Sequence, residues 1–392
     1  SISWALQGSA PGTSPCPVLQ PRDFVLLNAI TPTPMRQLLR ITATFALALV
    51  FSAGMAFGQS PDNETQVDQE GNDNTADVKQ VGQNQRAFVD QNGPGNSADA
   101  DEGHRAFITQ KGIQDGIDGK NNTAVVDQRF ESNFAHSTTI NQFGAGNQAG
   151  ANQGGNFAGN TVEIEQTGEN NYSAIQQSSA VTFKSTQTGD NNIIAGFAPG
   201  FDQLSPPDGA RGPARQETGA PFDGDLGLMD FTQMGDGNRI AGAEQNVGRS
   251  LAKVYQDGGS EITVLTQTGG DHTVRLDQFS GSEAEIIQKG SNNELAGADQ
   301  DGNFIDGGVA EQTNADLNFY GEKSALQNGT GNELGLFQDN GTANISQLGS
   351  SNKAVLYQDG SNTTSILQTG NEDLSRVIQD GTGNQATITQ EN

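Results

Sequence analysis

The sequence predicts an all-β fold, a β-solenoid in which strand–turn–strand repeats stack as rungs of about 22 residues, with amyloid-like cross-β structure on assembly. A glutamine recurs about every eleven residues along most of the chain, and a glycine usually follows it two positions later. Small and aliphatic residues alternate in phase with the glutamine, which is the pattern of a strand with one buried face. Two such units, each a strand and a turn, would form one rung.

The composition excludes a thick hydrophobic core. Only 33% of the 392 residues are hydrophobic and 6% are aromatic, while 51 are glycine. Such a chain either stays disordered or stacks thin layers against each other. The formal net charge of −27 argues against a nucleic-acid partner, because the phosphates would be repelled. The same charge favours solubility and opposes self-association at low ionic strength.

The N-terminal segment predicts export from the cell. Residues 1–34 show no repeat and are expected to be a non-native extension upstream of the true start, Met35. Residues 35–58 combine a basic beginning, an apolar run and a small-residue cleavage site, as in a secretory signal peptide. We expect cleavage between Gly58 and Gln59. A transmembrane anchor is the disfavoured alternative, because the apolar run falls short of the about 20 residues that span a bilayer. No membrane segment is therefore expected in the mature form.

The strands are predicted from the residues that share a face with each glutamine. Counting back by twos from Gln80 gives Val78, Ala76 and Asn74, and the same series recurs before other glutamines. Inward amides in stacked rungs would lie above one another and form Asn/Gln ladders. The glutamines assigned to this ladder are Gln69, Gln80, Gln91, Gln142, Gln166, Gln187, Gln233, Gln256, Gln267, Gln288, Gln327, Gln347, Gln358, Gln368, Gln379 and Gln390.

The turns are predicted by the spacing Gln-x-Gly-x-x-Asn, which occurs in ten units. Glycine adopts positive φ without steric cost, so it suits a tight reversal after the strand. The turn glycines are Gly71, Gly93, Gly144, Gly168, Gly189, Gly235, Gly290, Gly329, Gly349 and Gly381. The asparagines assigned to the ladder are Asn74, Asn96, Asn147, Asn171, Asn192, Asn238, Asn293, Asn332, Asn352 and Asn384.

These residues resemble the curlin repeat of bacterial curli subunits, Gln-x-Gly-x-x-Asn-x-Ala-x-x-x-Gln. The clear matches run from Gln69 to Gln80, from Gln347 to Gln358 and from Gln379 to Gln390. The resemblance implies a secreted, self-assembling subunit of extracellular amyloid-type fibres of a Gram-negative bacterium, which support adhesion and the biofilm matrix. It also implies three partners: further copies of the chain, a nucleator subunit and an outer-membrane secretion pore.

The repeats are interrupted between two predicted blocks, 59–194 and 231–392. Residues 195–230 hold five prolines, and proline cannot donate to a strand ladder. We therefore expect a Pro/Gly-rich loop or linker there. Whether the two blocks form one solenoid stays open at this stage.

No catalytic, cofactor-binding or metal-binding residues are predicted. The sequence shows no phosphate loop, no nucleophile triad and no His/Cys cluster. His104, His136 and His272 share no short metal spacing, and we expect isolated surface or turn histidines. Cys16 lies before the signal peptide, so the mature chain would have no disulfide. We predict that the protein is not an enzyme.

Two other functional classes and one other fold state stay open. A calcium-binding β-roll or β-helix surface adhesin is the first, because aspartates directly follow several repeat glutamines, namely Asp257, Asp301, Asp339, Asp359 and Asp380. A parallel β-helix carbohydrate-active enzyme, with paired carboxylates on the outer face, is the second. A disordered Gln/Asn-rich chain is the third, although it would not keep alanine and aliphatic residues in phase with glutamine.

The last repeat, Asn384 to Gln390, is among the most regular. A strand without a cap offers free N–H and C=O groups to another chain. We therefore expect this end to act as a docking edge for fibre growth.

Overall fold

The computed structural model describes residues 63–70, 74–92, 104–112, 121–129, 135–154, 159–178, 181–195, 204–205, 214–217, 227–246, 250–301, 303–306, 308–319 and 326–391. The chain divides into two compact units, Ser1–Phe57 and Gly58–Asn392, and all described residues belong to the second. The predicted extension (1–34), the signal peptide (35–58) and the cleavage site at Gly58 and Gln59 lie outside the described residues. Gly71, Gly93 and Asn96 lie outside them too.

The described residues form two sheets and no helix, so the prediction of an all-β solenoid is confirmed. Sheet 1 has sixteen strands: β1 (Glu64–Glu70), β3 (Arg86–Asn92), β5 (Thr123–Arg129), β7 (Gln148–Gly154), β9 (Tyr172–Ser178), β11 (Ile193–Ile194), β12 (Ala214–Glu217), β14 (Arg239–Ile240), β15 (Ala243–Asn246), β17 (Glu261–Gly270), β19 (Glu283–Ser291), β23 (Asp316–Phe319), β24 (Gln327–Thr330), β26 (Thr342–Ser350), β28 (Thr363–Asn371) and β30 (Gln385–Glu391).

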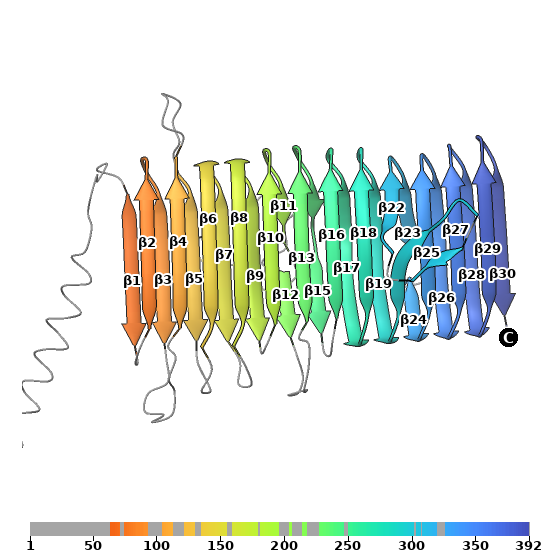
Figure 1. Cartoon of the computed structure of the whole chain (residues 1–392), viewed down its shortest axis with the longest axis horizontal. Coiled ribbons are helices and arrows are strands. Elements are labelled where there is room, and N and C mark those ends of the chain that lie inside the picture. Colours follow the sequence, from red (N-terminus) through yellow and green to blue (C-terminus); the bar gives the residue numbers. More distant parts are fainter. Residues whose placement is uncertain are drawn as a thin grey trace, which may run out of the picture. The chain divides into compact units, whose positions relative to one another are not determined.

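Sheet 2 has fourteen strands, and the chain alternates between the two sheets as it climbs the stack (Figure 1). They are β2 (Thr75–Val81), β4 (Arg105–Lys111), β6 (Ser137–Ala145), β8 (Thr161–Glu169), β10 (Thr182–Thr188), β13 (Leu228–Met234), β16 (Leu251–Asp257), β18 (Thr273–Phe279), β20 (Glu294–Ala298), β21 (Phe304–Ile305), β22 (Ala310–Thr313), β25 (Glu333–Asp339), β27 (Lys353–Asp359) and β29 (Leu374–Asp380).

Strands within each sheet pair in parallel, except for the short antiparallel pair of β20 and β21. The register places the repeat glutamine of one rung beside that of the next, as Gln69 beside Gln91 and Gln347 beside Gln368. A one-residue slip would turn every inward side chain to the outer face, so the buried face enforces this register.

The core is one continuous layer between the two sheets. In β5 the inward residues are Ala124, Val126 and Gln128, all buried, and the corresponding residues of the other rungs join the same hydrophobic cluster. Alanine at one inward position keeps the layer thin. Two residues before the ladder glutamine, most strands carry a larger aliphatic side chain, but β12 and β15 of sheet 1 carry only Ala214 and Ala243 there. The same cluster contains the larger Phe183 and Phe231 of sheet 2, whose ring centroids lie 6.1 Å apart in an edge-to-face arrangement. Large and small side chains together thus fill the space between the sheets.

The stack continues across residues 195–230, where the sequence led us to expect a loop or linker. Strand β10 pairs directly with β13, and β11 pairs with β14, so the two predicted blocks form one stack. The segment itself contains β12, which pairs with β9 and β15. Ile194 lies beside Ser173 and Ala214 lies beside Ile175, so the strand leaves the sheet and re-enters it nearly in register. The prolines of this segment lie outside the described residues.

The outer face of sheet 1 is partly covered at this insertion. Leu204 is buried with Tyr172, Ala174 and Ala195 in a second apolar cluster. The main-chain N–H of Ser205 donates to Gln148 Oε1 at 2.7 Å. A similar excursion in sheet 2 packs Phe304 close to Gly335, and Lys353 Nζ lies 4.4 Å from the centre of the Phe304 ring.

Candidate functional site

Two glutamine ladders run through the interior, one in each sheet. In every rung described, the side-chain Nε2–H donates to Oε1 of the next glutamine along its sheet, with Nε2–Oε1 distances of 2.6 to 3.1 Å. Sheet 1 orders Gln69, Gln91, Gln128, Gln153, Gln177, Gln216, Gln245, Gln267, Gln288, Gln327, Gln347, Gln368 and Gln390. Sheet 2 orders Gln80, Gln110, Gln142, Gln166, Gln187, Gln233, Gln256, Gln278, Gln312, Gln338, Gln358 and Gln379.

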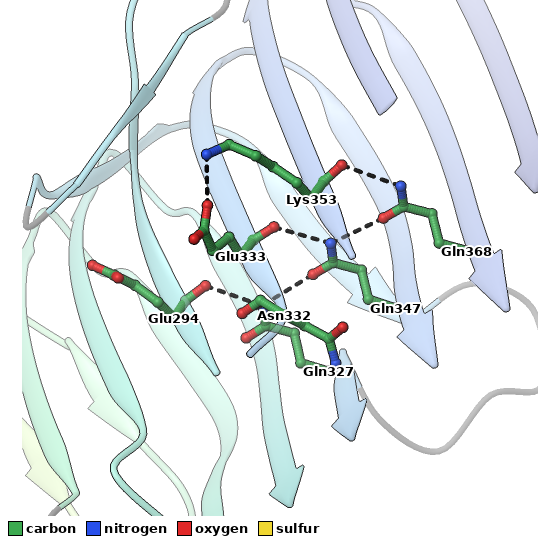
Figure 2. Close-up of polar contacts among 7 residues, drawn as sticks. All are labelled: Glu294, Gln327, Asn332, Glu333, Gln347, Lys353 and Gln368. Carbon is green, nitrogen blue, oxygen red and sulfur yellow. Dashed lines mark hydrogen bonds and ion pairs between the residues drawn. The ribbon is translucent and has the colours of Figure 1, made fainter. Parts of the chain in front are cut away.

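The second amide N–H of most ladder glutamines crosses to the opposite sheet (Figure 2). Gln347 Nε2 donates to the main-chain carbonyl of Glu333 at 2.9 Å, and Gln368 Nε2 donates to that of Lys353 at 3.1 Å. A flipped amide would place its oxygen against that carbonyl oxygen. The main chain therefore fixes the orientation of each amide, and with it the direction of the ladder.

Because the ladder amides are buried, the loss of one of these hydrogen bonds would cost stability. The glutamines inside the stack are buried, whereas Gln69 is exposed and Gln80 and Gln390 are half-buried at the ends of the described stack. A buried amide that loses its partner costs about 1–3 kcal/mol. Each interior glutamine instead has a donor on one side and an acceptor on the other.

Nine ladder glutamines are missing from the predicted ladder, and none of them is followed by the full spacing Gln-x-Gly-x-x-Asn. They are Gln110, Gln128, Gln153, Gln177, Gln216, Gln245, Gln278, Gln312 and Gln338. The signal that could have found them lies before the glutamine. Gln110 follows Ala106 and Ile108, both buried, at the inward positions that the repeat predicts.

The asparagines occupy columns in the arcs between strands. Asn171 is typical: its Oδ1 accepts the main-chain N–H of Asn192 in the next rung at 3.0 Å, and its Nδ2 donates to the carbonyl of Gly189 at 2.8 Å. Seven predicted asparagines are buried in these columns, namely Asn147, Asn171, Asn192, Asn238, Asn293, Asn332 and Asn352. Asn74 is half-buried and Asn384 is exposed.

The turn glycines serve these asparagine columns. Gly349 has φ 123°, and a Cβ there would collide with the carbonyl oxygen of Gly370 in the next rung. Its own carbonyl accepts Asn332 Nδ2 at 3.1 Å. The spacing Gln-x-Gly-x-x-Asn thus couples successive rungs through one close main-chain approach and one amide. The other described turn glycines with positive φ are Gly144, Gly168, Gly189, Gly235, Gly290, Gly329 and Gly381.

The histidines lie between strands, but the expectation that they are isolated or on the surface is wrong. His104, His136 and His272 are each about 1% exposed and stand in the asparagine columns. His104 and His136 occupy adjacent rungs, with ring centroids 4.9 Å apart and planes within 2° of parallel. Each histidine lies six residues before a ladder glutamine, the position that asparagine holds before Gln80. Counting back to that position would have revealed their burial.

The carboxylates lie mainly on the outer faces. Asp339, Asp359 and Asp380 stand in one column of sheet 2, whereas Asp257 lies beside Phe279 and Asp301 lies in a turn. The described residues contain no group of three or more His, Cys, Asp or Glu side chains placed to hold a metal ion. In the same part of the chain, no helix has the length and apolarity needed to cross a membrane.

Sequence comparison identifies the repeat that builds this geometry. The family model of the curlin associated repeat matches residues 61–93, 71–101 and 361–391. The chain carries curlin repeats at these places. Two of the matches cover β1 to β3, and the third covers β28 to β30, so the curlin pattern is recognised near both ends of the described stack. Between these matches, the parallel strand pairing and the glutamine ladders continue. No curated protein sequence matches the chain.

Proposed function

We propose that the chain is a secreted, self-assembling structural subunit of curli-type extracellular fibres that support cell adhesion and the biofilm matrix of a Gram-negative bacterium. The observation that supports this proposal most strongly is the pair of glutamine ladders, because they join successive described rungs through equivalent contacts. Among the described strands, β29 and β30 each pair on one side only, and so do β1 and β2. An unpaired strand edge is a template for another chain.

The last described rungs present the same inward pattern that pairs within the stack. Ala386, Ile388 and Gln390 of β30 are half-buried, although their counterparts in β28 are fully buried. A second copy that adds a strand there would complete their burial and extend the ladder. Curlin repeats are characteristic of structural subunits, which supports a non-enzymatic role. The same resemblance supports a nucleator subunit and an outer-membrane pore as further partners.

The test is to purify the chain from Gln59 and to follow its assembly by electron microscopy and fibre diffraction. We expect unbranched fibres with a meridional reflection near 4.8 Å, which is the spacing of stacked strands. As a matched comparison, Ile388→Lys should slow elongation, because the charge would enter the new interface, whereas Thr387→Lys on the outer face should leave it nearly unchanged. A protein that stays monomeric, or fibres without that reflection, would contradict the proposal.

A further inference from the structure

His104 and His136 (the histidine pair) stand in an asparagine column but take no part in the glutamine ladders. Their column is continued on either side by the neutral residues Asn74 and Asn160. The main-chain N–H of His104 donates to Asn74 Oδ1 at 3.0 Å, that of His136 donates to His104 Nδ1 at 3.1 Å, and that of Asn160 donates to His136 Nδ1 at 3.0 Å. The two rings thus carry the hydrogen-bond chain through three successive arcs.

These hydrogen bonds define the protonation state of the pair. A ring nitrogen that accepts an N–H cannot carry a proton itself, so both histidines are neutral with the proton on Nε2. Nδ1 therefore takes the place of asparagine Oδ1. Burial and, second to it, the charge of the neighbouring His104 lower the pKa of His136 to about 4, while the main-chain carbonyl of Arg129 opposes the shift. Burial also lowers the pKa of His104.

Charged groups on the surrounding elements do not compensate a charged ring. Arg105 follows His104 directly at the start of β4 and is exposed, and on β5 Arg129 Nε pairs with Asp127 at 2.9 Å. Within the described residues, the charge that bears on a protonated His136 is that of His104. Protonation would remove both acceptors and place two like charges at stacking distance inside the column.

We propose that the histidine pair is an acid-sensitive latch, which joins the starts of β4, β6 and β8 when neutral and releases them in acid. Acid would then keep this part of the stack from ordering, and neutralisation would complete it. The latch is a property of the single chain, so it stands or falls independently of fibre formation.

The sign and size of the effect follow from linkage. A histidine whose pKa is lower in the folded state binds its proton when the structure around it opens. The stability that the neutral ring contributes against this opening is therefore fully present above about pH 6.5, and it declines as the pH falls towards the folded pKa. For a ring with a folded pKa of about 4, the opening constant rises roughly 20-fold between pH 7 and pH 5. His104 adds to this effect in the same direction.

The test is hydrogen exchange of the monomeric mature chain between pH 7 and pH 5, corrected for the intrinsic pH dependence of amide exchange. We expect protection of β4 and β6 to fall at least about 20-fold, while β26 and β28 keep theirs. The double variant His104→Asn/His136→Asn restores the residue that fills this position elsewhere, so it should fold and lose the pH response. His272→Asn is the matched control and should leave the response of β4 and β6 intact.

The titration of the two imidazoles, followed by NMR on the same monomer, gives an independent readout. We expect neither ring to titrate near the ordinary value of about 6.5. Equal protection at both pH values, an unchanged pH response in the double variant, or an imidazole titrating near the ordinary value would overturn the proposal.

Discussion

At the scale of the residue, the glutamine amide makes a repetitive stack specific. Leucine would fill the same volume, but it would not mark the register of one rung on the next. Gln177 shows the requirement: it accepts from Gln153 at 3.1 Å and donates to Gln216 at 2.8 Å, and its Nε2 also lies 3.3 Å from the carbonyl of Val181. A side chain of the same shape without N–H groups meets only acceptors on that side.

Gln177→Glu tests this requirement. We expect a loss of about 3 kcal/mol or more in the free energy of unfolding at neutral pH. The buried carboxylate would face three acceptor oxygens, those of Thr161, Val181 and Gln216, and no described residue pairs a cation with them. Gln176→Glu is the matched control, since the neighbouring side chain points outward and is half-buried. Urea unfolding of the monomer measures both. An equal effect of the two substitutions would contradict the role of the ladder.

Gly349→Ala tests the close approach in the turn. We expect a loss of about 2 kcal/mol or more, because the residue has positive φ and its Cβ would meet the next rung. Gly270→Ala is the comparison, because a Cβ there has no atom within 4 Å. Thermal unfolding should separate the two variants by several degrees, and similar melting temperatures would refute the argument.

At the scale of the element, the features predicted from the sequence are those set by residues close together along the chain, namely strand faces and turns. Alternation predicted the inward faces of the strands that end in the assigned glutamines, and the spacing Gln-x-Gly-x-x-Asn predicted ten of the turns. The interrupted strands were not predictable in this way, because Ala195 and Ala214 are neighbours only in the sheet. The stacked histidines escaped for the same reason: Gln91 and His104 are separated by an insertion, so the period is visible only after the rungs are aligned.

Removal of residues 196–213 tests the account of the interrupted strand. Joining Ala195 to Ala214 should restore a continuous strand in register, with a loss of about 1–3 kcal/mol from the missing Leu204 contacts. Removal of 196–212 leaves one extra residue, which turns the inward side chains outward. We expect the first variant to fold and the second to lose a large part of its stability by urea unfolding. Equal stability of the two would contradict the assigned register.

At the scale of the whole described stack, the side chains on the outer faces distinguish one rung from the next, which the uniform core does not. Every rung offers the core nearly the same residues, so a slip by one rung would cost little inside. Ion pairs between adjacent rungs differ from place to place, as Arg86 with Glu64 at 2.9 Å and Lys353 with Glu333 at 2.6 Å. Each contributes little by itself, but a slip by one rung would place Glu64 beside Thr123 and Glu333 beside Leu374, so both ion pairs would be lost.

The net charge of −27 predicts the salt dependence of assembly. We expect sodium chloride to shorten the lag of thioflavin-monitored assembly, because it screens repulsion between copies and along the column of Asp339, Asp359 and Asp380. Calcium at matched ionic strength should give the same lag. Asp359→Asn should reduce the dependence on salt. A calcium effect that persists at matched ionic strength and disappears in Asp359→Asn would show specific binding instead.

Because the ladder amides all have the same orientation, their dipoles are aligned along the stack. Main-chain hydrogen bonds between parallel strands point alternately up and down, as Thr161 N–H to Val181 and Gly189 N–H to Thr167 do, so their dipoles largely cancel. The glutamine side chains all point the same way, from Gln69 towards Gln390 and from Gln80 towards Gln379. Their dipoles add, with the positive pole at the C-terminal strands. The ladder side chains thus give the described strands a net dipole along the stacking direction.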